Sequence, residues 1–143
     1  MVEFRDGKCV FSLRVAGVLR RCGSLLVQRT RRGLILPGGR VELLEQSGGA
    51  LAREMFEELG VHVAVGRSLW IVENVFDYRE AHVHQVLMIY EMRTDEEIAV
   101  DRMRAEGMRW WPIERLKNCG LMPEFLQTSI IELPSSVEHV CVA

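Results

Sequence analysis

The stretch from Gly39 to Val61 constrains the fold more than any other part of the chain. Gly38 and Gly39 follow Pro37 and end an apolar run, which is typical of a strand that stops in a loop. At about 100° per residue, the residues after Ser47 place apolar side chains on one arc, the face that a helix buries. That arc contains Leu51, Ala52, Met55, Phe56 and Leu59. Ser47 is the expected N-cap, and Gly60 is placed to end the helix in a left-handed conformation.

Three glutamates occupy a neighbouring arc of this helix. Glu54, Glu57 and Glu58 stand at spacings i, i+3 and i+4, so we expect their carboxylates to converge. Like charges at this spacing destabilise a helix by about 0.2–0.5 kcal/mol per pair, and a bound cation would remove that cost. Oxygen ligands favour Mg²⁺ or Mn²⁺ over Zn²⁺. Taken by itself, the pattern also fits a solvated acidic face.

The spacing over residues 39–61 resembles the signature of the Nudix (MutT-like) hydrolases. That signature is a glycine, five residues, Glu, seven residues, Arg-Glu, an aliphatic, any residue, two glutamates, any residue, Gly and an aliphatic. Every fixed position is met, by Gly39, Glu45, Arg53, Glu54, Met55, Glu57, Glu58, Gly60 and Val61. The resemblance implies an α/β (α+β) Nudix fold, in which a mixed β-sheet lies between helices and the motif forms a loop–helix–loop.

The resemblance also implies a role for each site residue. Glu54, Glu57 and Glu58 would bind Mg²⁺ or Mn²⁺, joined by the carbonyl of Gly39. Arg53 and Glu45 would hold the loop against the helix, with Gly38 and Gly60 supporting the site. A guanidinium suits this task because it binds a carboxylate through two parallel hydrogen bonds. An ordinary i, i+4 pair with Glu57 is the alternative for Arg53.

The implied activity is metal-dependent hydrolysis of a pyrophosphate linkage. Such a reaction needs neutralised phosphate charge, an oriented water and a proton acceptor. Glu54 is our first choice of base, and Glu80 and Glu97 are outside candidates. The substrate would be a nucleoside diphosphate linked to another moiety, such as a (d)NTP, oxidised nucleotide, nucleotide sugar or ADP-ribose. A catalytically silent nucleotide-binding or sensor domain is the alternative, although such domains commonly lose glutamates of this motif. The wider family also makes a homodimer possible.

The substrate-binding residues are less constrained by the sequence. Arg29, together with Arg31 and Arg32, could meet phosphates or form an exposed turn. Phe76 and Tyr78 offer rings on which a base could stack, although we expect Phe76, like Trp70, in the core. Further candidates are Glu80 and His84. Gln85 stands where similar sequences usually have Glu, and the effect of this lost carboxylate stays open.

The length of 143 residues predicts one domain over 1–143. A net charge of −2 gives no electrostatic reason to expect a nucleic-acid polymer or an anionic membrane as partner. The chain shows no leader-like start and no long apolar run, which favours a cytoplasmic location. Its four cysteines lie far apart without a C-x-x-C, so we expect reduced, partly buried thiols rather than a zinc site or disulfides.

The remaining pattern predicts strands and short helices around the motif. We expect a polar loop over 77–81, a charged loop or solvated edge over 93–106, and helices over 114–116 and 123–131. Residues 137–142 could add an edge strand. The other expected strands are 11–19, 24–29, 34–36, 62–65, 69–76, 84–92 and 108–113.

Overall fold

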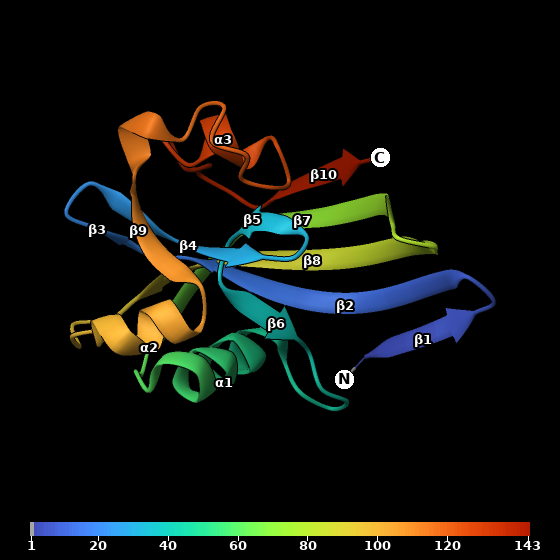
Figure 1. Cartoon of the computed structure of the whole chain (residues 1–143), viewed down its shortest axis with the longest axis horizontal. Coiled ribbons are helices and arrows are strands. Elements are labelled where there is room, and N and C mark those ends of the chain that lie inside the picture. The colour runs from blue at the N-terminus through green and yellow to red at the C-terminus, as the bar shows by residue number, and fades with distance from the viewer. Residues whose placement is uncertain (1) are drawn as a thin grey trace.

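Two β-sheets form the frame of the computed structural model, which describes residues 2–143 (Figure 1). The larger sheet has the order β1-β2-β8-β7-β10, and β6 also pairs with β2. The β2–β8 and β7–β10 pairs are parallel and the other pairs are antiparallel, so the sheet is mixed. Its strands are β1 (Glu3–Asp6), β2 (Cys9–Val18), β6 (Gly38–Arg40), β7 (Ala64–Tyr78), β8 (Ala81–Arg93) and β10 (Glu138–Val142).

The smaller sheet is antiparallel and has the order β3-β4-β5, with β9 paired to β4. Its strands are β3 (Arg20–Arg21), β4 (Ser24–Thr30), β5 (Gly33–Ile35) and β9 (Met108–Pro112). Cys22 and Gly23 both have positive φ and form the tight β3–β4 turn. The helical segments are α1 (Ser47–Leu59), α2 (Val100–Ala105), the 3₁₀ turn η1 (Ile113–Arg115) and α3 (Leu126–Ser129).

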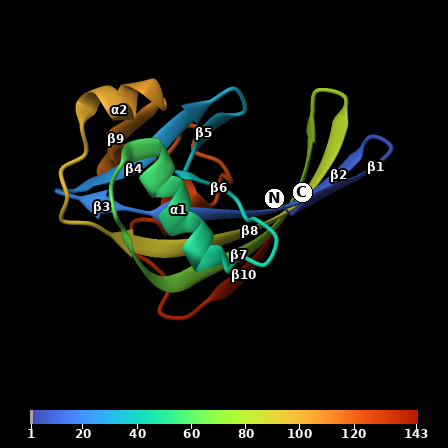
Figure 2. The ribbon, with the colours of Figure 1, turned by 90° about the horizontal axis from the view of Figure 1, so that it is seen from below.

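A hydrophobic core lies on each face of the larger sheet. On one face, α1 packs Leu51 and Met55 against Val15 and Met92 of the sheet. Figure 2 shows α1 lying across the sheet, while the β1–β2 and β7–β8 hairpins project beyond it. On the other face, the smaller sheet and the segment around α3 cover Val72 and other sheet residues. The predicted α/β (α+β) fold with a mixed sheet is confirmed, although one face of that sheet is covered by the smaller sheet and α3 rather than by helices alone.

The bounds of α1 differ from the prediction at its start. Gln46 is the N-cap, and the hydroxyl of Ser47 hydrogen-bonds the Tyr90 hydroxyl at 2.7 Å instead of capping the helix. Gly60 ends the helix with φ 70° as expected, its N–H donating to the carbonyl of Phe56. Placing Phe56 on the buried arc was wrong: it is 50% exposed, with its ring 4.8 Å from that of His62.

Two predictions around strand β7 were wrong, because its pairing with β8 extends through residues that were expected to lie in loops. The strands expected over 62–65 and 69–76 form the single strand β7, which keeps its partner β8 across irregularities between Val65 and Trp70. The loop expected over 77–81 shrinks to Arg79 and Glu80, because Tyr78 already pairs with Ala81. Arg79 adopts φ 57° in this turn.

The segment 93–106 is not a plain solvated loop. It contains α2, and it buries Ile98 and Met103 in the core beneath α1. Arg102 of α2 donates to the carbonyls of Glu57 and Glu58, at 3.2 Å each, where the α1 dipole favours a cation. The sequence analysis missed α2 and its packing because Ile98 and Met103 are two apolar residues within a segment rich in charged ones.

The C-terminal predictions were partly confirmed. The last helix is shorter than 123–131, since α3 covers Leu126–Ser129, whereas β10 does form an edge strand beside β7. All four cysteines are free, but Cys9, Cys22 and Cys141 are exposed rather than partly buried. None of the helices within residues 2–143 has the length and apolar character needed to cross a membrane.

Candidate active site

The two glycines after Pro37 bring backbone against the acidic face of α1. Strand β6 pairs Gly39 with Val15, so that Gly38 packs on the β2 backbone. A Cβ added to Gly38 would stand 2.0 Å from the Val15 carbonyl oxygen. A Cβ on Gly39 would stand 2.3 Å from Cδ of Glu54. The sequence therefore needs glycine at both positions, and the Gly39 backbone lies beside the Glu54 carboxylate.

Arg53 ties this loop to the helix. Its Nε and Nη2 donate to the two carboxylate oxygens of Glu45, at 2.8 and 2.9 Å, in a bidentate pair. Nη2 also donates to the carbonyl of Arg40 at 3.1 Å. Nη1 donates to Glu54 at 3.1 Å and to Glu57 at 3.2 Å. Loop and helix thus share one guanidinium, which is the geometry of the loop-holding role and includes the i, i+4 pair.

The contact between Arg53 and Glu45, here called the clamp, keeps Glu45 ionised. The side-chain hydrogen bond from Arg53, followed by that from the backbone N–H of Glu42, lowers the pKa of Glu45 to about 2. In turn, the hydrogen bond to Glu45 raises the pKa of Arg53 above its ordinary value. Both groups therefore stay ionised at neutral pH.

Glu58 occupies a different environment from the other two glutamates. Burial, followed by the charges of Glu54 and Glu106, raises its pKa to about 7. Its Oε2 atom is buried without a hydrogen-bond partner among the described residues. A buried carboxylate oxygen without a donor is costly, and a hard cation would satisfy it. This observation fits a divalent metal at the acidic face of α1.

The ligand oxygens of Glu54, Glu57 and Glu58 do not all lie within 4.8 Å of one another. Among residues 2–143, the trio of potential ligand atoms that meets within 4.8 Å lies elsewhere, at Glu73, His139 and Cys141. Glu54 and Glu57 turn towards Arg53, and Glu58 is partly buried near Arg14. Like-charge repulsion and the hydrogen bonds from Arg53 explain why the expected convergence of the three carboxylates is incomplete.

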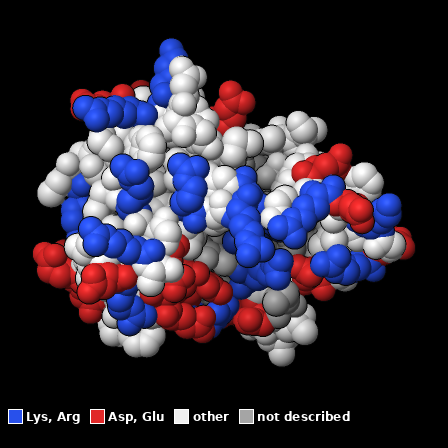
Figure 3. Space-filling model, viewed as in Figure 1, with Lys and Arg blue, Asp and Glu red and all other residues white. Residues whose placement is uncertain are grey.

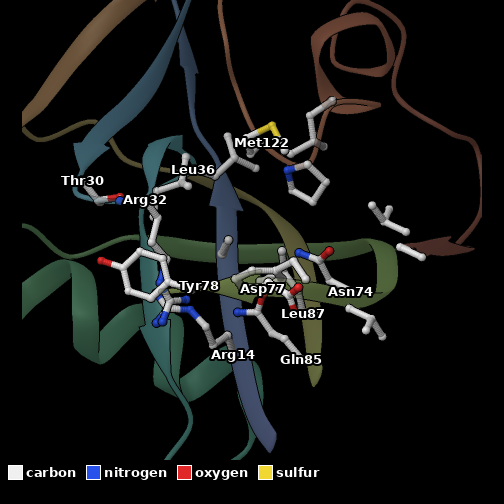
Figure 4. A pocket seen from close by; sticks show the side chains of 18 of the residues that line it. Arg14, Thr30, Arg32, Leu36, Asn74, Asp77, Tyr78, Gln85, Leu87 and Met122 are labelled. Carbon is white, nitrogen blue, oxygen red and sulfur yellow. The ribbon is translucent and has the colours of Figure 1, made fainter. Parts of the chain in front are cut away.

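A cleft of about 640 Å³ opens on the other side of β2 (Figure 4). Arg14 joins it to the glutamates: it lines the cleft, and its charge interacts with those of Glu54 and Glu58. Burial, with Arg32 and Arg40 nearby, lowers the pKa of Arg14. Figure 3 shows basic side chains across the middle of this face, above an acidic group at the level of α1 and β6. The apolar walls include Leu36, Leu87, Met122 and Leu126.

An arginine–aromatic cluster forms one end of the cleft. The guanidinium of Arg32 lies 4.8 Å from the Tyr78 ring centroid and 5.6 Å from that of Phe76. Phe76 is therefore a partly exposed lining residue and not part of the core, unlike Trp70, which is buried as expected. The cation–π contacts hold the positive charge of Arg32 beside the cleft.

Three substrate-binding candidates lie outside this lining. Arg29 is exposed on β4, Glu80 occupies the β7–β8 turn, and His84 packs edge-on against Phe11 at 5.5 Å. Residues alternate faces along β8, so Gln85 lines the cleft and is 5% exposed, whereas His84 points away. Gln85 thus places an amide, in place of the usual carboxylate, on the cleft wall.

Arg14 is the lining residue that the sequence analysis missed. It stands within the apolar strand β2, between Leu13 and Val15. A charged residue inside a buried strand is uncommon, because its desolvation must be compensated by partners. This charged residue within an apolar run could have marked Arg14 as a candidate site residue. The residues with which its charge interacts lie in distant segments and could not be predicted in the same way.

Gly39→Ala should strongly lower activity while the chain still folds. The added methyl would displace the Glu54 carboxylate, and a displacement of about 1 Å can cost a hundredfold in rate. We expect kcat to fall by about that factor or more. Turnover measured beside circular dichroism checks this, with Gly49→Ala as the control because a Cβ there meets nothing within 4 Å. Unchanged turnover would contradict the close approach.

Part of this chain is similar in sequence to curated phosphohydrolases. Diphosphoinositol polyphosphate phosphohydrolase 2 from Rattus norvegicus is 41% identical over 80 residues, covering 56% of this chain and 43% of that protein. Diphosphoinositol polyphosphate phosphohydrolase 3-beta from Homo sapiens is 36% identical over 80 residues, covering 48% of its length. The match thus spans less than half the length of these curated relatives.

Solved structures share the fold at low sequence identity. The mutator MutT protein from Bacillus halodurans superposes with a TM-score of 0.65 at 18% identity, covering 90% of this chain and 86% of that one. A UDP-X diphosphatase gives 0.60 at 13% identity, with 90% and 66% covered. The NUDIX domain itself matches residues 10–130, which is most of the sequence. The chain therefore belongs to the NUDIX domain family.

Proposed function

We propose that this chain hydrolyses a pyrophosphate linkage with the help of Mg²⁺ or Mn²⁺. The single observation that carries the proposal is the unpartnered, buried Oε2 of Glu58, whose charge interacts with those of Glu54, Glu57 and the cleft residue Arg14. Glu54, Glu57, Glu58 and the Gly39 carbonyl would hold the metal. The bound ion supplies Lewis-acid chemistry that neutralises phosphate charge and activates water.

The residues of the chain account for the other requirements of the reaction. Arg14 and Arg32 line the cleft and would bind phosphate oxygens, while Arg53 holds Glu54 and Glu57 in place. Glu54 would accept the proton of the attacking water, because its carboxylate lies directly beside the backbone of Gly39. Glu80 and Glu97 are weaker base candidates, because both are exposed and neither lines the cleft.

For the substrate we propose a nucleoside diphosphate linked to a second group. The apolar walls and the Tyr78 and Phe76 rings suit a base, which could stack at about 1–3 kcal/mol. The cluster of Arg14, Arg31 and Arg32 also suits a more highly phosphorylated ligand. Because the curated relatives are named diphosphoinositol polyphosphate phosphohydrolases, a diphosphoinositol polyphosphate is the second candidate.

A phosphate-release screen tests both substrate classes. The purified chain is incubated with (d)NTPs, oxidised nucleotides, nucleotide sugars, ADP-ribose and a diphosphoinositol polyphosphate, each with Mg²⁺, with Mn²⁺ and with a chelator. We expect metal-dependent turnover of one class. Binding of a nucleotide without turnover of any compound would instead identify a silent sensor domain, the alternative reading.

A further inference from the structure

A second group of potential metal ligands lies far from the glutamates of α1. Strand β10 pairs in parallel with β7, and this register places Cys141 directly opposite Glu73. His139 and Cys141 are two residues apart and therefore share one face of β10. Val140 and Val142, on the opposite face, pack against the core. Two strands separated by more than sixty residues thus present a carboxylate, an imidazole and a thiol together on an exposed surface.

The distances within this group approach those of a tetrahedral metal site. Sγ of Cys141 lies 3.6 Å from Oε2 of Glu73 and 3.7 Å from Nε2 of His139. Nε2 of His139 and Oε2 of Glu73 are 2.8 Å apart, as a hydrogen-bonded pair. Zinc bonds of about 2.3 Å to sulfur and 2.0 Å to nitrogen or oxygen separate tetrahedral ligands by roughly 3.3–3.6 Å. Only the imidazole–carboxylate pair has to open, by a few tenths of an ångström.

We propose that Glu73, His139 and Cys141 bind a zinc ion at the exposed face of the β7–β10 pair. Thiolate and imidazole ligands favour Zn²⁺ over Mg²⁺, so this site and the glutamates of α1 select different metals. On binding, the Cys141 thiol releases its proton to solvent as the S–Zn bond forms. His139 keeps its ring proton on Nδ1 and offers Nε2. Water completes the fourth position.

The site would act on the cleft through β10. Val142 and Ala143 follow directly after the ligands and line the cleft wall. Strand β10 is an edge strand with three of its five residues exposed. A metal that joins its last residues to β7 would fix this wall in position. The site could not be predicted from the sequence, since H-x-C is not a zinc motif and Glu73 is distant in the chain.

Cobalt(II) titration of the tag-free chain of 143 residues tests the proposal. Co²⁺ replaces Zn²⁺ in such sites, and its thiolate complexes have a near-ultraviolet charge-transfer band that oxygen-ligated Co²⁺ lacks. We expect this band to appear with a stoichiometry of one Co²⁺ per chain, to disappear on adding Zn²⁺, and to persist in excess Mg²⁺. No band, removal of the band by Mg²⁺, or one Co²⁺ shared between two chains would overturn the proposal.

Variants assign the ligands. Cys141→Ser and His139→Gln change exposed side chains and Glu73→Gln a partly exposed one, so the fold should survive, as circular dichroism would show. Each should lose the band at Co²⁺ concentrations that saturate the parent chain. Cys22→Ser is the control for a different exposed thiol. His82→Gln is the control for a different histidine–carboxylate pair, since His82 Nδ1 lies 2.7 Å from Asp77 Oδ1. A band that survives in Cys141→Ser, or vanishes in Cys22→Ser, would place the metal elsewhere.

Discussion

Glu57→Gln should lower kcat by about a thousandfold, the scale of losing one charge-stabilising group in an active site. The substitution keeps the shape of the side chain and removes its charge. Glu57 lies on the solvent side of α1, with its side chain 57% exposed, and its described partner is Arg53 at 3.2 Å. If it helps hold the metal, the loss appears in turnover and in the Mg²⁺ concentration needed for half-maximal rate.

Stability separates this role from a structural one. An exposed ion pair contributes only about 0–1 kcal/mol, so urea unfolding of Glu57→Gln should nearly match that of the parent chain. Glu132→Gln, at an exposed glutamate far from α1 in sequence, is the matched control and should retain full activity. Near-normal turnover of Glu57→Gln in saturating Mg²⁺ would refute the assigned metal-binding role.

The motif could be predicted from the sequence because its constraints are local. Helical periodicity identified Leu51, Met55 and Leu59 as buried, and Gly60 ends α1 in the left-handed conformation that its place predicted. The predicted buried arc was too wide at Phe56. Its ring lies at the surface beside the ring of His62 and does not pack into the core. Periodicity reports which residues share a face, whereas neighbouring segments decide how wide the buried part of that face is.

The cleft could not be predicted in the same way. Its wall combines β2, the β4–β5 turn, the β7–β8 hairpin and the C-terminal strand, and their meeting depends on long-range pairing such as Cys9 with His82. Alternation along β8 could have separated His84 from Gln85, but one sequence does not say which face meets the substrate. Likewise, Met103 and Ile98 looked solvated because charges surround them in the sequence, whereas in space they pack beneath α1.

Arg53→Ala should impair catalysis far more than it destabilises the fold. The side chain makes five hydrogen bonds: two to Glu45 and one each to Arg40, Glu54 and Glu57. Losing them frees two candidate metal ligands and detaches the loop that carries Gly39. Because small misplacements in an active site can cost about a hundredfold, we expect kcat/KM to fall by at least that factor. The free energy of unfolding should fall by only about 1–2 kcal/mol.

Arg53→Lys and Glu45→Gln resolve what the guanidinium contributes. Lysine keeps the charge but lacks the planar fork, so Arg53→Lys should resemble Arg53→Ala in kcat/KM if the bidentate geometry matters. In the double variant Arg53→Ala/Glu45→Gln, the two losses should not add, because both break the same contact. Additive losses, or an Arg53→Ala chain that loses stability but keeps its rate, would reduce Arg53 to an ordinary helix pair with Glu57.

The contact between Arg53 and Glu45 should also make the free energy of unfolding depend on pH in acid. The pKa of Glu45 is about 2 in the folded chain against 4.5 for an ordinary glutamate, so the folded form binds this proton less readily. The contribution of the clamp is therefore fully present above pH 4.5 and is lost as the pH falls towards 2. Urea unfolding at several pH values should show parent and Glu45→Gln chains differing above pH 4.5 and converging below it. A difference that stays constant down to pH 2 would show that the ionised Glu45 carboxylate is not what joins the loop to α1.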